Sequence, residues 1–221
     1  MHIEPGIVAG AKIVLSYATA ATAGLYSLRL AFEAMRDRGL TSLVARAALA
    51  TVATFVFFQV LPTAPVGVSE VHLILGSTLF LLFGTAPAAI GLALGLLIQG
   101  LLFAPADLPQ YGMNVTTLLV PLFAVAALAR RIVAPGTAYV DLTYAQALAL
   151  STAFQGGVVA WVAFWAFYGQ GVEATAGVLT FGAAYMLVIA LEPLVDLAVL
   201  AGAKSLRGLR GSGLVTPRLY A

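Results

Sequence analysis

The stretch VHLILGSTLFLLFGTAPAAIGLALGLLIQGLLF, residues 71–103, contains no Asp, Glu, Lys or Arg. A membrane helix needs about 20 apolar residues to cross roughly 30 Å of hydrocarbon, so this stretch is too long for one helix. Gly84 and Pro87 interrupt it, and both residue types disfavour a helix interior. We therefore expect two membrane-embedded helices here, the first of them short.

The rest of the chain has the same character. Its 221 residues are 62% hydrophobic and 9% charged, with a mean hydropathy of +1.02, whereas an ordinary soluble domain is roughly 25% charged. Long apolar runs recur without the alternation that a membrane β-barrel requires. The sequence predicts an all-α fold, a polytopic membrane helical bundle. The absence of cysteine excludes disulfides, thiolate metal sites and iron–sulfur clusters.

Seven transmembrane helices are expected along the chain. They cover about 9–32, 46–61, two segments within 71–103, then 114–129, 142–168 and 174–201. Residues 1–202 would form one transmembrane domain, and 203–221 a flexible basic cytoplasmic tail. There is no room for a separate soluble domain.

The basic residues set the orientation of the bundle, because cytoplasmic loops carry an excess of Lys and Arg. Every Lys and Arg except Lys12 falls on one side of the seven-helix arrangement. This predicts a multi-pass protein of the cell inner membrane with its N-terminus outside and its C-terminus in the cytoplasm. The first residues do not resemble a signal peptide, because Glu4 replaces a basic cluster. The two histidines, His2 and His72, then lie on the outer side.

The first residues, MHIEPG, contain a possible chelate. Methionine is expected to stay in place, since the aminopeptidase that removes it needs a small second residue. The amine of Met1, the backbone nitrogen of His2 and the His2 imidazole can then close two chelate rings in one plane. His72 can supply a fourth nitrogen, completing a square-planar site that suits Ni(II), Cu(II) or low-spin Co(II). The alternative is a solvated His2 and a His72 that bonds a carbonyl.

Three segments carry a family resemblance: MHIEPG at 1–6, the stretch 71–103, and YGMNVTTLLVPLF at 111–123. They resemble the cobalt/nickel-binding membrane component of energy-coupling-factor ABC transporters, and the similarity extends from Met1 to about Ala201. The resemblance implies Met1, His2 and His72 as metal ligands, with Asn114 orienting the site. It implies Co(II) or Ni(II) as the bound substrate and no organic cofactor. Residues 1–202 would be the metal-capture domain.

The same resemblance implies partners. These are a transmembrane coupling subunit, ATPase subunits and a small accessory membrane protein. The lipid bilayer surrounds the chain, and no nucleic acid is expected as a partner. The chain has no GxxxxGK[ST] phosphate loop, so other chains would hydrolyse ATP. Ala20 with Gly24 and Gly91 with Gly95 are small residues four apart, which permit close helix approach. One such face would dock the coupling subunit.

Two carboxylates, Glu4 and Glu70, depart from the family pattern. Either could accept a hydrogen bond from a histidine N–H and fix its tautomer, or could concentrate cations near the site. A solvated position is the alternative for both. Gln155, Glu192 and Asp196 lie within predicted spans and could line a path, or serve a structural role with the two acids paired to cytoplasmic arginines.

Other functions fit the sequence less well. An enzyme is disfavoured, because neither HExxH nor GxSxG occurs. A vitamin-capture subunit or a non-transporting membrane sensor on the same kind of bundle is the remaining alternative. Cobalt is placed before nickel, because the resemblance includes members that serve cobalamin synthesis. Copper would bind more tightly to such a site, so selectivity would rest partly on metal availability or on partners.

Overall fold

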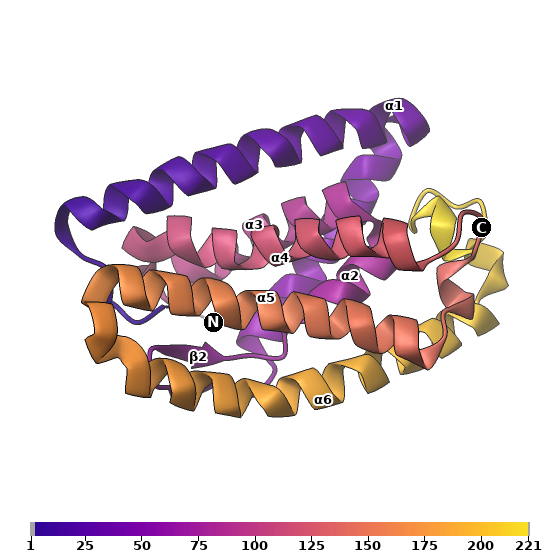
Figure 1. The fold of residues 1–221 in the computed structure, drawn as a ribbon. Coiled ribbons are helices and arrows are strands. Elements are labelled where there is room, and N and C mark those ends of the chain that lie inside the picture. Colours follow the sequence, from indigo (N-terminus) through magenta and orange to yellow (C-terminus); the bar gives the residue numbers. More distant parts are fainter. Residues whose placement is uncertain (1–2, 221) are drawn as a thin grey trace.

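Six α-helices and one short hairpin make up most of the computed structural model, which describes residues 3–220 (Figure 1). The helices are α1 (Ile13–Gln59), α2 (Gly76–Phe83), α3 (Thr85–Leu102), α4 (Tyr111–Ile132), α5 (Tyr144–Gln170) and α6 (Thr175–Ser205). Short 3-10 helices cover Gly10–Lys12, Pro105–Gln110, Tyr139–Asp141, Gly171–Ala174, Arg207–Leu209 and Pro217–Leu219. The prediction of an all-α helical bundle is confirmed.

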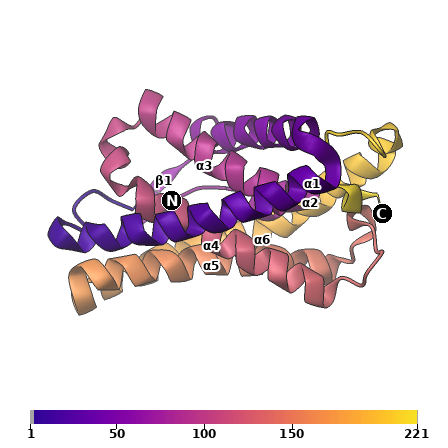
Figure 2. The same ribbon diagram turned by 90° about the horizontal axis from the view of Figure 1, so that it is seen from above.

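Helix α1 consists of two arms that meet at Gly39. This residue has φ 82° and ψ 162°, a conformation that glycine adopts much more readily than other residues. The break turns the second arm of the helix back along α3 (Figure 2). The two arms correspond to the first two predicted spans, although helix continues through most of the polar turn expected between them.

The charge-free stretch 71–103 divides where the sequence predicted. Gly84, with φ 86°, separates the eight residues of α2 from α3. Four stretches of the described chain are long and apolar enough to cross a membrane: Gly10–Gln59, Thr85–Leu102, Pro105–Ile132 and Tyr144–Ser205. Helix α2 rises only about 12 Å, less than the thickness of the hydrocarbon. The short first helix is thus confirmed, while the count of seven spans stays a prediction.

Glycines set how closely the helices approach one another. A Cβ at Gly91 would lie 2.4 Å from the Ala50 Cβ, and one at Gly95 would lie 2.6 Å from the Thr54 Cβ. The Gly91–Gly95 face therefore packs against the second arm of α1. Gly24 has no atom within 4 Å of such a Cβ, so the Ala20–Gly24 face makes no comparable approach within the chain.

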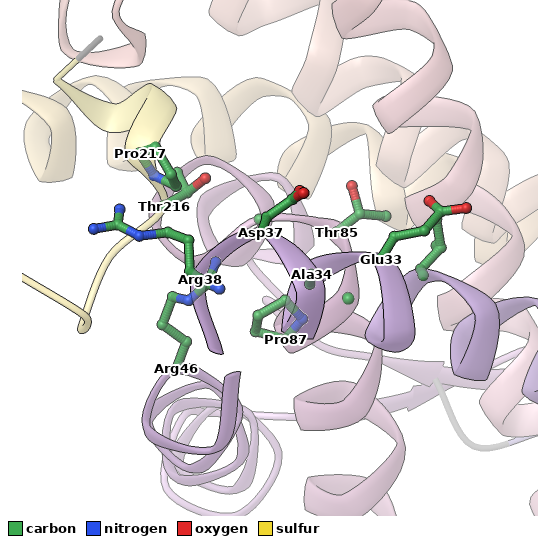
Figure 3. Close-up of a pocket in the computed structure, with 12 residues that line it drawn as sticks. Glu33, Ala34, Asp37, Arg38, Arg46, Thr85, Pro87, Thr216 and Pro217 are labelled. Atoms are coloured by element: carbon green, nitrogen blue, oxygen red, sulfur yellow. The ribbon is translucent and has the colours of Figure 1, made fainter. Parts of the chain in front are cut away.

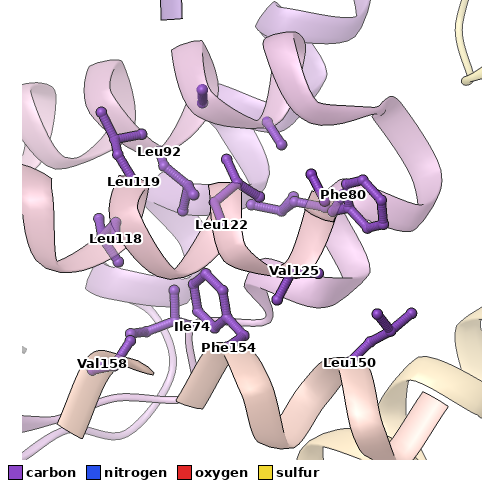
Figure 4. Packing of buried hydrophobic residues seen from close by; sticks show 14 of the residues in the cluster. Ile74, Phe80, Leu92, Leu118, Leu119, Leu122, Val125, Leu150, Phe154 and Val158 are labelled. Carbon is purple, nitrogen blue, oxygen red and sulfur yellow. The ribbon is translucent and has the colours of Figure 1, made fainter. Parts of the chain in front are cut away.

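The apolar core lies between α2, α3, α4 and α5 (Figure 4). Phe154 of α5 points toward Ile74 and Leu122, and all three are fully buried. Gly76 permits this packing, because a Cβ there would lie 2.0 Å from the Phe154 ring. The start of α2 is thereby held at the centre of the bundle.

A β-hairpin that the sequence did not predict precedes α2. Strands β1 (Ala64–Val66) and β2 (Ser69–Val71) pair antiparallel. Gly67 in their turn has φ 63°, and a Cβ there would lie 2.2 Å from the carbonyl oxygen of Gly177 on α6. The hairpin is therefore pressed directly against the α6 backbone.

The C-terminal residues fold back onto the end of the bundle. The Thr216 N–H donates to the carbonyl of Leu82 at 2.7 Å, and the Tyr220 hydroxyl donates to that of Ala203 at 2.7 Å. Leu219 is fully buried. This arrangement differs from the flexible tail expected over 203–221, because apolar side chains within the tail find buried positions.

Candidate metal centre

The first described residues are anchored inside the bundle. Ile3 is fully buried and forms an antiparallel bridge with Ser69 of β2. Its N–H donates to Oδ1 of Asn114 at 2.9 Å, and the Glu4 N–H donates to the Val68 carbonyl at 3.3 Å. These bonds join the beginning of the chain to the hairpin and to α4.

His72 lies immediately after β2, on the extended segment that leads into α2. It is 2% exposed, and its Nε2 lies 2.9 Å from Oε2 of Glu70. The ring packs against Phe58 of α1 with centroids 4.9 Å apart. A carboxylate acceptor at Nε2 favours the tautomer that carries its proton there, which leaves the lone pair on Nδ1. The contact is one that would prepare Nδ1 as a metal ligand.

Asn114 belongs to the first turn of α4 and is 1% exposed. Its side-chain oxygen holds the backbone of Ile3. The sequence predicted an orienting role for Asn114 but did not identify the group it would orient. In the structure this bond links α4 to the backbone of Ile3, and an orienting role of Asn114 at a metal site stays a prediction.

Glu70 and Glu4, the two carboxylates that depart from the family pattern, have different surroundings in the structure. Glu70 contacts His72, and its side chain is 32% exposed, so the carboxylate connects a buried imidazole to the surface. Glu4 contributes its backbone, donating to Val68 and accepting from the Ile7 N–H at 3.1 Å. A role for the Glu4 side chain stays a prediction.

Met1 and His2, the other predicted ligands, lie outside the described residues. Within residues 3–220, no group of three His, Cys, Asp or Glu side chains is arranged to hold a metal ion. His72 alone would make a weak site. A metal centre of the predicted kind therefore depends on the first two residues.

The acidic side chains of α6 behave differently from the expectation. Glu192 and Asp196 are fully buried and bond to Ser77, Thr78 and Gln155. The buried Arg46 instead donates to the backbone carbonyls of Ser42 and Phe83. Neither acid pairs with an arginine side chain that the structure describes, in contrast to the alternative of pairing with cytoplasmic arginines.

A cavity of about 210 Å³ lies where the break in α1, the start of α3 and the C-terminal residues meet. Figure 3 shows Arg38 and Arg46 at one side of it and Glu33 at the other. Charges of both signs line the cavity, so it has no clear preference for an ion of either sign. His72 is not among the residues that line it.

Comparisons with known proteins agree with this architecture. A family model described as cobalt uptake substrate-specific transmembrane region matches residues 2–208. A crystal structure described as a truncated transition metal transporter is similar in fold, with a TM-score of 0.63 and 18% identity over 95% of this chain and 98% of that one. No curated protein matches the sequence.

Proposed function

Because the chain belongs to the cobalt uptake substrate-specific transmembrane region family and is a multi-pass membrane protein, we propose that it captures a divalent transition-metal ion for import. Its role is that of the substrate-capture subunit of an energy-coupling-factor ABC importer. Cobalt is the proposed ion, in support of cobalamin synthesis, and nickel is the alternative. The task is transport and not catalysis.

The proposed site has four nitrogen ligands in a plane. Met1 supplies its amine, His2 its backbone and ring nitrogens, and His72 its ring nitrogen. The observation that carries this proposal is the hydrogen bond from the Ile3 N–H to Asn114, together with the bridge from Ile3 to Ser69. Ile3 directly follows the proposed ligand His2 in the chain, and its anchoring beside β2, the strand that precedes His72, supports a site shared by the two histidines.

Glu70 supports the same arrangement. A carboxylate that accepts from one ring nitrogen of histidine raises the basicity of the other and holds the ring in place. The contact between Glu70 Oε2 and His72 Nε2 at 2.9 Å has this form. Nδ1 of His72 is the nitrogen assigned to the metal.

The proposed orientation has the N-terminus outside and the C-terminus in the cytoplasm, with the two arms of α1 counted as separate spans. The metal then enters near the hairpin and leaves at the opposite end of the bundle. Energy comes from ATPase subunits through a transmembrane coupling subunit, since this chain has no nucleotide-binding loop. The open Ala20–Gly24 face is the proposed docking surface for that coupling subunit.

The direct test concerns the terminal amine. One glycine is added before Met1, or the amine is acetylated, and Co(II) retained by the purified protein is measured by elemental analysis. We expect retention to fall at least tenfold, because one equatorial nitrogen is lost. The matched control carries the added glycine after Ala221. Unchanged retention in the extended protein would overturn the chelate.

The choice between cobalt and nickel needs a separate experiment. Both ions fit four nitrogens in a plane, so affinity alone discriminates weakly. Protein isolated from cells that are supplied equally with both ions should contain mainly cobalt. Mainly nickel in the isolated protein would reverse the assignment of the substrate and leave the site unchanged.

A further inference from the structure

A second polar cluster lies in the interior of the bundle, apart from His72. It is formed by side chains from α2, α5 and α6, namely Ser77, Thr78, Gln155, Glu192 and Asp196. Thr78 is 4% exposed and the other four are fully buried. The metal site proposed at Met1, His2 and His72, called the outer site from here on, uses none of these residues.

The hydroxyls of α2 hold the two carboxylates together. Ser77 Oγ lies 2.9 Å from Oε1 of Glu192 and 2.7 Å from Oδ2 of Asp196. Thr78 donates to the other oxygen of Asp196, and the Gln155 amide donates to the other oxygen of Glu192. A serine hydroxyl has a single proton, so Ser77 satisfies only one of its two carboxylates at a time.

No described side chain supplies a counterion for the carboxylates of this cluster. Both acids are removed from water, and each would repel the charge of the other. The ion pairs that join Arg29 with Glu33, Lys204 with Asp141 and His72 with Glu70 include neither Glu192 nor Asp196, and no other described side chain forms an ion pair with either acid. Two buried carboxylates in contact with one hydroxyl require a cation or a shared proton.

An unsatisfied oxygen points to a cation. Oε1 of Gln155 is buried and has no hydrogen-bond partner among the described residues, although the same amide contacts Glu192. Oγ of Ser151, one turn earlier on α5, is also buried without a partner in that part of the chain. Buried polar groups are normally satisfied, so the Gln155 oxygen, whose amide group contacts Glu192, is available as a ligand.

We propose that Glu192 and Asp196, with Ser77, Thr78 and Gln155, form an internal divalent-cation site of oxygen ligands. Carboxylate and amide oxygens suit Mn(II) and Mg(II), and they bind Co(II) or Ni(II) less tightly than imidazole does. The existence of this site does not depend on the outer one. Its role as an intermediate binding site on the path of the imported ion rests on the proposed function.

The position of the cluster fits an intermediate binding site on that path. Helix α2 begins four residues after His72, and the cluster includes the first turn of that helix. Tyr185 lies two turns before Glu192 on α6, is fully buried, and has its hydroxyl beside the His72 backbone. Tyr185 and Glu192 therefore lie along one side of α6, leading from His72 inward. A weaker oxygen site beyond a tighter nitrogen site permits release, as conduction requires.

The test uses Mn(II), which prefers oxygen ligands and is a poor match for four planar nitrogens. Binding to the purified full-length protein is measured by equilibrium dialysis, with electron paramagnetic resonance to observe the bound ion. We expect one equivalent in the wild type and in His72→Ala. The double variant Glu192→Gln/Asp196→Asn should bind at least tenfold more weakly, and Asp141→Asn, which removes an exposed carboxylate, should bind normally.

The outcomes separate the two sites. The double variant is expected to fold, because neutralising buried charges often stabilises a protein, and its Co(II) retention at the outer site should persist. If it does not fold, Ser77→Ala replaces it and should weaken Mn(II) binding at least threefold. Wild-type protein that binds no Mn(II) between pH 6 and 8 would assign the pair a shared proton and overturn the proposal. Equal binding by the double variant would overturn it as well.

Discussion

The polar region around His72, proposed to face outward, and the cluster around Glu192 are built on different kinds of backbone. His72 lies on an extended segment between a hairpin and a short helix, held by strand pairing and by the Ile3 contact. Glu192 and Asp196 lie within the long helix α6 and accept hydrogen bonds from side chains of two other helices. Irregular backbone within a membrane bundle is tolerated where it is buried in protein or lines a cavity.

The two kinds of backbone fit two different proposed roles, capture of the metal ion and its release. Extended backbone allows a main-chain nitrogen and a terminal amine to approach an imidazole, which a continuous helix would not permit. Helices instead present side-chain oxygens at fixed spacing, and these bind a transition metal less strongly. Nitrogen ligands outside and oxygen ligands inside would thus form a sequence from tight capture to release. Variants that affect one region and spare the other test this comparison.

The largest effect is expected for His72→Ala. Loss of one of four nitrogen ligands should reduce Co(II) affinity about 100-fold or more, as measured by isothermal titration calorimetry. Expression and folding should persist, because the imidazole is replaced by a smaller apolar group beside Phe58. Normal affinity in this variant would show that the fourth ligand lies elsewhere and would remove the distinction between the regions.

A somewhat smaller effect is expected for Gly67→Ala. A Cβ at position 67 would lie 2.2 Å from the backbone oxygen of Gly177 in α6, and the φ of Gly67 is positive. Removing this clash requires the hairpin to move, at a cost of about 1–3 kcal/mol. Because His72 follows the hairpin, the movement should reduce Co(II) affinity about 30-fold, or about 2 kcal/mol. Gly211→Ala is the control, since Gly211 has φ 81° but no atom within 4 Å. Equal affinities in both variants would exclude a role for the hairpin contact.

The sequence predicted the helices better than the contacts between them. The break at Gly84 follows from local chemistry, because glycine and proline interrupt an apolar run. The hairpin was missed, since its strands have three residues each and Pro65 lies in one of them. The Ile3–Asn114 bond joins residues 111 apart, and no local pattern specifies such a pair.

The inner cluster had a signal in the sequence that could have been used. Glu192 and Asp196 are four residues apart in an apolar helix, and Ser77 and Thr78 stand together in another apolar run. Polar groups in a membrane bundle need partners, so two isolated polar sets predict contact with each other. The opposing interpretation, pairing with arginines, failed because the buried Arg46 is satisfied by backbone carbonyls.

Glu70→Gln tests whether the outer imidazole depends on its carboxylate. Groups that orient a ligand histidine typically contribute 10–100-fold in metal affinity, and the neutral glutamine keeps one hydrogen-bond acceptor. We expect Co(II) affinity to fall about tenfold in titration calorimetry. Mn(II) binding at the inner cluster should not change. Glu4→Gln is the matched control, and an equal loss in that variant would indicate general electrostatic attraction of cations.

The smallest effect is expected for Asn114→Ala, because Asn114 acts on the site through the N-terminal segment. The variant leaves the buried N–H of Ile3 without its acceptor, at a cost of about 1–3 kcal/mol. Two other bonds, to Ser69 and Val68, still hold the segment beside the hairpin. We therefore expect Co(II) affinity to fall only about fivefold.

Asn114→Asp separates positioning from bulk packing, since it retains the oxygen that accepts from Ile3 and has nearly the same volume. It should restore most of the affinity lost in Asn114→Ala. If both variants lose the same affinity, the Ile3 bond does not position the ligands, and packing around α4 accounts for the loss. If neither loses any, the strand bridge to Ser69 is sufficient, and the outer site depends on the hairpin alone.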